Sequence, residues 1–206
     1  IGTAETASFD FVADACRSLL EIYPQIRLNF YDDNADSLYE KLDKGTLDFA
    51  LVFTHAIPAK YKMIQLPRKD QWGVLVPKNH PLTKLEQVTV EEIVSYPLIV
   101  SNQSDIDKSA FANYDYKVVA TYNLLYTASR LVQAGLGIAL CLDGIVDHPE
   151  LVFLPCTNQG DEGYYLIWKD RHDQTATEKA FLEEIEAMIP SVKLEIAMVI
   201  QCFFTL

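Results

Sequence analysis

The stretch LVQAGLGIALC, residues 131–141, places two glycines between a helical pattern and a continuous apolar run. A phosphate-binding loop has the order strand, glycines, helix, so that the N-terminus of the helix meets the anion. Here the order is reversed, and the required third glycine is missing. Gly135 suits the position after a helix C-cap, and Gly137 suits a tight turn into a strand. The stretch therefore predicts a helix that turns into a buried strand, and it argues against a nucleotide-binding loop.

The same order occurs 90 residues earlier, in KLDKGTLDFALV, residues 41–52. Gly45 follows a helical pattern there, and a continuous apolar run follows the glycine. Such a run is typical of a strand that is buried on both faces of a parallel sheet. The repeat predicts two α/β lobes of similar build.

Helical and strand patterns alternate along the rest of the chain. Strand patterns cover residues 26–31, 47–53, 72–77, 96–100 and 163–169. Helical patterns cover residues 8–22, with Ser8 as a cap, 32–45, 123–134 and two segments that begin at capping boxes, Thr89 with Glu92 and Thr175 with Glu178. This alternation predicts an α/β fold with a mostly parallel sheet.

The composition limits the classes of partner. The 206 residues carry a formal net charge of −12, whereas a surface that binds duplex nucleic acid needs clustered Lys and Arg. We therefore expect no nucleic-acid binding by this chain itself. The first residue is not Met and no signal peptide opens the sequence, so we expect a fragment of a longer cytoplasmic protein.

Residue types that commonly catalyse reactions or bind metals form no recognisable motif in this sequence. The cysteines, Cys16, Cys141, Cys156 and Cys202, stand apart in apolar surroundings, where a thiol acts as a small apolar side chain. The histidines, His55, His80, His148 and His172, fall in or near predicted loops. We therefore predict no catalytic residue, no metal ligand and no cofactor, and we expect that the chain is not an enzyme.

The last residues, SVKLEIAMVIQCFFTL, are strongly apolar at their end. A helix that spans a bilayer needs roughly 20 apolar residues, and this run is too short. We predict no membrane insertion. The segment is either a terminal strand or helix that docks on the body, or an appendage without a functional interpretation.

Several stretches together resemble the effector-binding domain of LysR-type transcriptional regulators. They are IGTAETASF, LLEIYPQIRLNF, LYEKLDKGTLDFALVF, WGVLVPKNHPL, YPLIVS, LVQAGLGIALC and YYLIWKDRHDQTATEKAFLEEI, in the order of that family and over nearly residues 1–188. The combination of G-x-L-D-x-A-L, V-P-x-x-H-P-L and A-G-L-G-I-A-L is specific. Two departures are the segment LDGIVDH, residues 142–148, and the apolar end after Pro190.

The resemblance implies a fold like that of type 2 periplasmic binding proteins, with two Rossmann-like lobes joined by two crossover strands near residues 72–76 and 164–168. Lobe I would comprise residues 1–73 and 169–206, and lobe II residues 74–168. The N-terminal winged helix-turn-helix domain of that family is absent from this chain. The full-length protein would bind DNA only through that missing part, and this chain would sense a small molecule in the cleft between the lobes.

Candidate effector-binding residues follow strands at the carboxyl edge of the expected sheets, where ligands of α/β proteins bind. The first lobe contributes the loop Ala4–Ser8, the acidic turn Asp32–Asn34 and the end of the buried strand. The second lobe contributes polar residues after the strand at 96–100 and just before the helix at 123–134. Thr6, Ser8 and Asn34 also suit helix caps, an alternative that stays open. By resemblance, Ser101 and Asn123 are the stronger candidates of the second lobe. The predicted set is Ala4, Glu5, Thr6, Ser8, Asn34, Phe53, Thr54, Ser101, Asn102, Tyr122 and Asn123.

The charge of the ligand stays open in the sequence. Helix N-termini favour an anion such as a carboxylate. Glu5, Asp32 and Asp33, however, bring negative charge to the same place. A zwitterion, an amine-bearing molecule or a neutral polar molecule is therefore compatible with this cleft.

Two other functions share this fold. A free-standing solute-binding protein would carry a secretory signal, and an enzyme would need an acid–base group in the cleft that the sequence does not reveal. We also expect a homodimer or homotetramer, because the helices at 8–22 and 123–134 have wide apolar faces. In the family that the chain resembles, such helices pair antiparallel between subunits. The alternative is that both faces pack fully against their own sheets.

Overall fold

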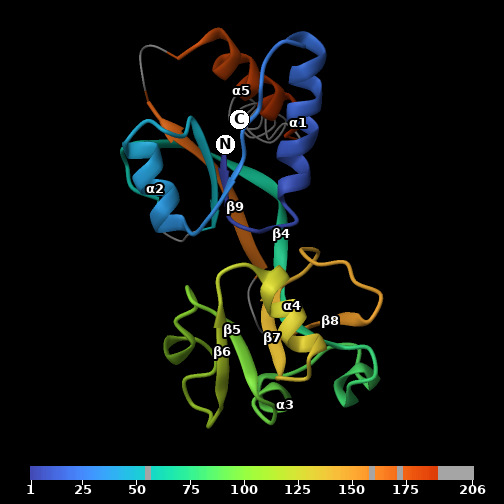
Figure 1. The fold of residues 1–206 in the computed structure, drawn as a ribbon. Coiled ribbons are helices and arrows are strands. Elements are labelled where there is room, and N and C mark those ends of the chain that lie inside the picture. The colour runs from blue at the N-terminus through green and yellow to red at the C-terminus, as the bar shows by residue number, and fades with distance from the viewer. Residues whose placement is uncertain (54–56, 158–160, 171–173, 190–206) are drawn as a thin grey trace, which may run out of the picture. The chain divides into compact units, whose positions relative to one another are not determined.

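The computed structural model describes residues 1–53, 57–157, 161–170 and 174–189 (Figure 1). The chain forms two compact units. The first comprises Ile1–Asp10 and Leu28–Asp170, and the second comprises Phe11–Arg27 and Arg171–Leu206. The apolar end of the sequence and Thr54 lie outside the described residues.

The first unit holds all the described strands and most of the described helices. The strands are β1 (Gly2–Thr3), β2 (Tyr31–Asp32), β3 (Phe49–Phe53), β4 (Tyr61–Pro77), β5 (Leu98–Ser101), β6 (Val118–Tyr122), β7 (Ile138–Leu142), β8 (Leu151–Pro155) and β9 (Asp161–Lys169). The helices are α2 (Ala35–Asp43), α3 (Val90–Ile93), α4 (Leu125–Gln133) and the 3₁₀ turns η1 (Pro81–Lys84) and η2 (Ile106–Lys108).

Sheet A contains β2, β1, β3, β9 and the first part of β4, in that order. The β1 strand pairs in parallel with β2 and β3, whereas β9 runs antiparallel to β3 and to β4. Leu38 and Leu42 of α2 pack with Ala50, Val52 and Ile167 of this sheet. The α2 helix therefore covers one face of sheet A.

Sheet B contains the second part of β4 together with β5 to β8. The β5 strand pairs in parallel with β6 and β7, and β4 runs antiparallel to β7 and β8. Two separate clusters of buried side chains involve this sheet. One includes Leu125, Ala128 and Val132 of α4, and the other includes Val90 and Ile93 of α3.

The β4 strand belongs to both sheets (Figure 1). Its pairing partner changes from β9 of sheet A to β7 of sheet B between Gln71 and Trp72. This change lies at the start of the range 72–76 expected for one crossover. Residues 164–168, expected for the other crossover, instead pair with β3 inside sheet A. The proposed division into two lobes stays a prediction.

The helix–glycine–strand interpretation of residues 131–141 is confirmed. Gly135 follows the C-cap Ala134 with φ +79°, the left-handed conformation that glycine adopts without steric cost. Gly137 has a different reason to lack a side chain. A Cβ there would lie 2.2 Å from the carbonyl oxygen of Pro97, which accepts a 2.9 Å hydrogen bond from the N–H of Ile138. Gly45, at φ +68°, repeats the role of Gly135 after α2.

Other expectations need correction. The sheet arrangement is mixed rather than mostly parallel, because β4 and β9 are antiparallel to their neighbours. The strand expected at 26–31 is reduced to Tyr31–Asp32, and Phe30 is exposed and packs edge-on against Phe9. The first part of β4, β6 and β8 were not expected at all.

The second unit contains most of α1 (Phe9–Ile22) and α5 (Ala176–Met188). The α1 helix buries Val12, Ala15, Cys16 and Leu19 along one face. The α5 helix begins at the expected capping box of Thr175 and Glu178. The capping box of Thr89 and Glu92 is likewise confirmed at the start of α3.

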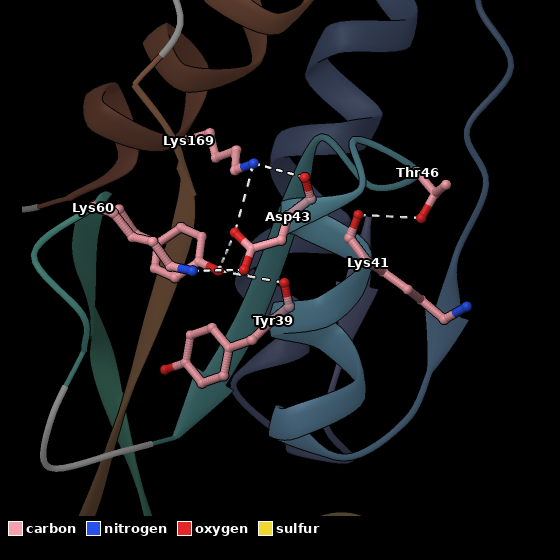
Figure 2. A network of polar contacts seen from close by, with 7 residues as sticks. Tyr39, Lys41, Asp43, Thr46, Lys60 and Lys169 are labelled. Atoms are coloured by element: carbon pink, nitrogen blue, oxygen red, sulfur yellow. Dashed lines mark hydrogen bonds and ion pairs between the residues drawn. The ribbon is translucent and has the colours of Figure 1, made fainter.

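A polar network joins the end of α2 to β4 and β9 (Figure 2). The Asp43 carboxylate accepts hydrogen bonds from Lys60 Nζ at 2.5 Å and from the Tyr61 hydroxyl at 3.0 Å. The backbone carbonyl of Asp43 accepts a 2.7 Å hydrogen bond from Lys169 Nζ. The bond with Lys60 is the main reason that the pKa of Asp43 lies below its usual value. Because water reaches the charged side chains of Asp43, Lys60 and Lys169, their ion pairs contribute little to stability.

Candidate functional site

A cavity of about 520 Å³ lies in the first unit, where the carboxyl ends of several parallel strands meet. Ala4 and Glu5 follow β1, Asn34 follows β2, and Phe53 ends β3. From sheet B, Ser101 ends β5, Tyr122 ends β6 and Asn123 follows it. The structure thus brings together seven of the predicted residues: Ala4, Glu5, Asn34, Phe53, Ser101, Tyr122 and Asn123.

Thr6 and Ser8 do not line this cavity. Both hydroxyls donate hydrogen bonds to Asp70, a fully buried carboxylate of β4. Thr6 Oγ1 also accepts the N–H of Ser8 at 2.9 Å, the kind of local bond expected if the pair caps the helix. Their position supports this structural alternative, because their polar atoms already have partners inside the protein.

Asn102 is also not part of the wall. It is exposed in the turn after β5, and its N–H donates to the carbonyl of Tyr122 at 2.8 Å. Asn102 thereby holds the ends of β5 and β6 together beside the cavity.

The Asp70 network extends to the turn after β7. Arg68 Nε lies 3.3 Å from Asp70, and a terminal nitrogen of Arg68 lies 3.6 Å from Asp143. Asp143 also accepts the N–H of Gln71 at 2.8 Å. The unusual segment at 142–148 is therefore attached to β4 through its second residue, Asp143.

Sequence reasoning missed most of the apolar wall. The missed residues include Trp72, Ile106, Phe111, Leu124, Leu125, Leu140, Cys141, Leu142, Ile145, Cys156 and Tyr164. Most lie inside strands or in loops distant in the sequence from the predicted edges. The segment 103–109 also contributes Gln103, Ser104, Asp105, Lys108 and Ser109, and its polar character directly after a buried strand was the one signal available.

Glu5 is the central charged group of the wall. Its Oε2 accepts a hydrogen bond from the N–H of Leu125, the first residue of α4. The N-cap, Leu124, makes no side-chain hydrogen bond to the helix, so the Glu5 carboxylate serves the N-terminus in its place. Burial raises the pKa of Glu5, the Leu125 bond partly opposes this, and the negative charge of Asp32 raises it further.

The other charged side chains of the wall already have partners within the protein. Lys108 Nζ lies 2.6 Å from the Asp105 carboxylate. Asp33 accepts hydrogen bonds from the Ser37 hydroxyl at 2.6 Å and from the N–H of Asn34 at 2.8 Å. The Ser37 bond is the main reason that the pKa of Asp33 is lowered. Asp33 is therefore held within its own turn.

Burial suppresses ionisation of the thiols and the phenol in the wall. It raises the pKa of Cys156 to about 11 and also raises the pKa of Cys141. A protonated thiol is a poor nucleophile. Burial likewise raises the pKa of Tyr122, whose hydroxyl donates to the carbonyl of Leu140 at 2.7 Å. The arrangement is suited to holding a small molecule between apolar walls.

The described residues contain neither a metal-ligand cluster nor a membrane-spanning helix. No group of three His, Cys, Asp or Glu side chains in residues 1–53, 57–157, 161–170 and 174–189 is placed to hold a metal ion. Within the same ranges, no helix has the length and apolar character needed to cross a membrane.

Comparisons with known proteins agree on one family. The sequence model of the LysR substrate binding domain matches residues 1–189. The chain is 26% identical over 149 residues to the uncharacterised HTH-type transcriptional regulator YybE of Bacillus subtilis, covering 69% of this chain and 51% of that protein. It is 25% identical over 158 residues to the HTH-type transcriptional regulator CysB of Haemophilus influenzae, covering 68% of this chain and 45% of that protein.

A solved structure shows the same fold. The effector-binding domain of QuiR in complex with shikimate superposes with a TM-score of 0.77 at 20% identity, covering 89% of this chain and 92% of that one. The chain spans about half the length of the curated regulators it matches. The sequence match over residues 1–189, together with the shared fold, shows that the chain belongs to the LysR substrate-binding domain family.

Proposed function

We propose that this chain is the effector-sensing part of a LysR-type transcriptional regulator, and that the cavity of about 520 Å³ binds a small metabolite. The observation that carries the proposal is the position of this cavity at the carboxyl ends of the parallel strands, in a chain of the LysR substrate-binding family. The relatives are transcriptional regulators, and the similar QuiR domain is in complex with shikimate.

In this proposal the chain is a binding protein of the cytoplasm and not an enzyme. Lobe I consists of residues 1–73 and 169–206, and lobe II of residues 74–168. Binding of the effector shifts the relative population of open and closed lobes. The full-length protein binds DNA through an N-terminal winged helix-turn-helix outside this chain, and the shift changes the geometry of those domains.

A substitution that fills the cavity tests its role. Ser101 is half-buried in the wall, and Asn102 is exposed outside it. A metabolite that binds at 100 times its dissociation constant stabilises the wild type by about 2.7 kcal/mol, which raises Tm by roughly 5–10 °C. In a thermal-shift screen, we expect Ser101→Tyr to lose this increase and Asn102→Tyr to retain it. A metabolite-dependent increase that persists in Ser101→Tyr would place the binding site elsewhere.

The proposal includes a homodimer or homotetramer. Tyr126 of α4 is 69% exposed and Leu136 just after α4 is 44% exposed, while Ile22 at the end of α1 is 56% exposed. Exposed apolar side chains of this kind mark interaction surfaces when they gather in a patch. Sedimentation equilibrium is expected to give a dimer for the wild type and a smaller species for Tyr126→Glu, with Thr127→Glu as the control. A wild-type monomer at micromolar concentration would contradict the oligomer.

A further inference from the structure

The N-terminus of α4 lies at the cavity wall, where a helix dipole favours an anionic ligand. In this protein a carboxylate of the chain itself occupies that place. Oε2 of Glu5 accepts the N–H of Leu125, across 120 residues of sequence. A ligand carboxylate would have to displace Glu5 or approach it with a charge of the same sign. Both cost binding free energy, so this end of the cavity disfavours anions.

The second carboxylate oxygen of Glu5, a residue of the cavity wall, accepts no hydrogen bond from the described residues. Among the described residues, the Leu125 N–H is the hydrogen-bond donor that contacts Glu5, and no Lys or Arg forms an ion pair with it. The charged neighbour that acts on Glu5 is Asp32, which has the same sign. The half-buried negative charge is therefore without a cation inside the protein, and a cation supplied by a ligand would stabilise it.

The other charged side chains of the wall also favour a cationic ligand. Glu5, Asp33 and Asp105 are acidic, and Lys108 is the basic residue of the wall. Because Lys108 is paired with Asp105 at 2.6 Å, its ammonium group is not available to bind a carboxylate without losing that partner. The ionisable side chains of the wall therefore carry a net negative charge, which attracts cations.

Aromatic side chains share the wall of the cavity with Glu5. The rings of Phe53 and Tyr164 stand with their centroids 6.1 Å apart, and Trp72 also belongs to the wall. Aromatic faces attract ammonium groups and also pack against apolar bodies. The walls thus suit a molecule with an apolar part and one cationic group.

We propose that the effector is an amine that is cationic at neutral pH, with its ammonium group on the free oxygen of Glu5 and its apolar body against Phe53, Trp72 and Tyr164. This inference rests on the proposed function, because it assigns a ligand class to the same cavity. It also resolves the choice among zwitterionic, amine-bearing and neutral ligands that the sequence left open.

The test compares three series of probes, which are amines, alcohols and carboxylates. Each series contains one aromatic and one aliphatic compound, and matched probes share the same apolar body and differ only in the polar group. The probes are 2-phenylethylamine, 2-phenylethanol and 3-phenylpropanoate, with hexylamine, hexanol and heptanoate as the aliphatic set. Dissociation constants are measured by ligand-observed NMR titration on the complete chain. We expect the amines to bind at least tenfold more tightly than the matched alcohols, because a hydrogen bond between two charged groups is stronger than one with a neutral partner.

Glu5→Gln removes the charge but keeps an oxygen that can accept the Leu125 N–H, so the variant is expected to fold, as far-UV circular dichroism would verify. The amines should lose about tenfold or more in affinity for Glu5→Gln, whereas the alcohols should change by less than about twofold. The matched control is Glu91→Gln, which removes the same charge from an exposed position on α3 outside the cavity wall. It should leave all three series unchanged.

Each other outcome has a distinct meaning. Carboxylates that bind as well as amines, or an amine preference that persists in Glu5→Gln, would overturn the amine proposal and leave the proposed function standing. If none of the three series binds to the folded chain with saturation, the cavity is not a site for small amphipathic molecules. That result would overturn the amine inference, and the thermal-shift comparison of Ser101→Tyr with Asn102→Tyr would separately test the proposed function.

Discussion

Replacement of Asp70 by alanine is expected to lower the free energy of unfolding by about 3 kcal/mol. The carboxylate is fully buried and accepts hydrogen bonds from the hydroxyls of Thr6 and Ser8, while Arg68 lies 3.3 Å away. Alanine would leave two buried hydroxyls without their acceptor and a guanidinium without its nearer partner. Arg68 is 42% exposed, so water recovers part of its loss and the effect falls at the lower end for a broken buried pair.

In a chain of this size, the expected loss corresponds to a decrease of roughly 6–12 °C in Tm, measurable by calorimetry. Two further variants serve as comparisons: one removes only the ion pair of Asp70, and the other changes a network at the surface. Arg68→Met removes the ion pair and keeps the hydroxyl bonds, and it should cost less than Asp70→Ala. Asp43→Asn changes the exposed network of Figure 2 and should shift Tm far less. An Asp70→Ala variant as stable as Asp43→Asn would show that the buried network contributes no net stability.

Replacement of Gly137 by alanine is expected to cost about 3 kcal/mol, for a steric reason. The new Cβ would lie 2.2 Å from the carbonyl oxygen of Pro97, and that carbonyl is backbone held by the N–H of Ile138. Neither group can move without weakening the pairing of β5 and β7, which joins Leu98 to Ile138. Urea denaturation would measure the loss.

Gly135→Ala is the matched control two residues away. The space around Gly135 is open, but its φ of +79° is unfavourable for a side chain, which costs roughly 1–2 kcal/mol. We therefore expect the order wild type, Gly135→Ala, Gly137→Ala in decreasing stability. If Gly135→Ala is the less stable of the two variants, the close approach of Gly137 to Pro97 is relieved by a backbone shift.

These two glycines show why part of the fold was predictable from the sequence. A glycine after a helical pattern, followed by an apolar run, has a local cause, and β3, β7 and the capping boxes of α3 and α5 follow from the same kind of signal. The first part of β4 gives no such signal, because Lys62, Arg68 and Lys69 are exposed along it. The β6 strand begins with the exposed pair Val118 and Val119, so it lacks a buried pattern at its start.

Some residues of the candidate site were likewise predictable from the sequence, and others were not. Residues that directly follow a buried strand, such as Glu5 and Ser101, were accessible to sequence reasoning because the edge of a parallel sheet gathers them. Trp72 and Tyr164 come from the antiparallel strands β4 and β9, for which the parallel pattern offers no rule. Thr6 and Ser8 were assigned to the ligand because their partner Asp70 is more than 60 residues away in the sequence.

The two sheets differ in how the chain builds them. Every strand of sheet B lies within the continuous segment that runs from β4 to β8, whereas sheet A needs β1 from the beginning of the chain and β9 near its other end. During synthesis on the ribosome, all the strands of sheet B therefore emerge before β9 does. Sheet B can form at that stage, while β3 keeps one edge unpaired until β9 arrives between it and β4. The nascent chain is thus exposed to wrong pairing at β3 for as long as the ribosome takes to translate the whole of sheet B.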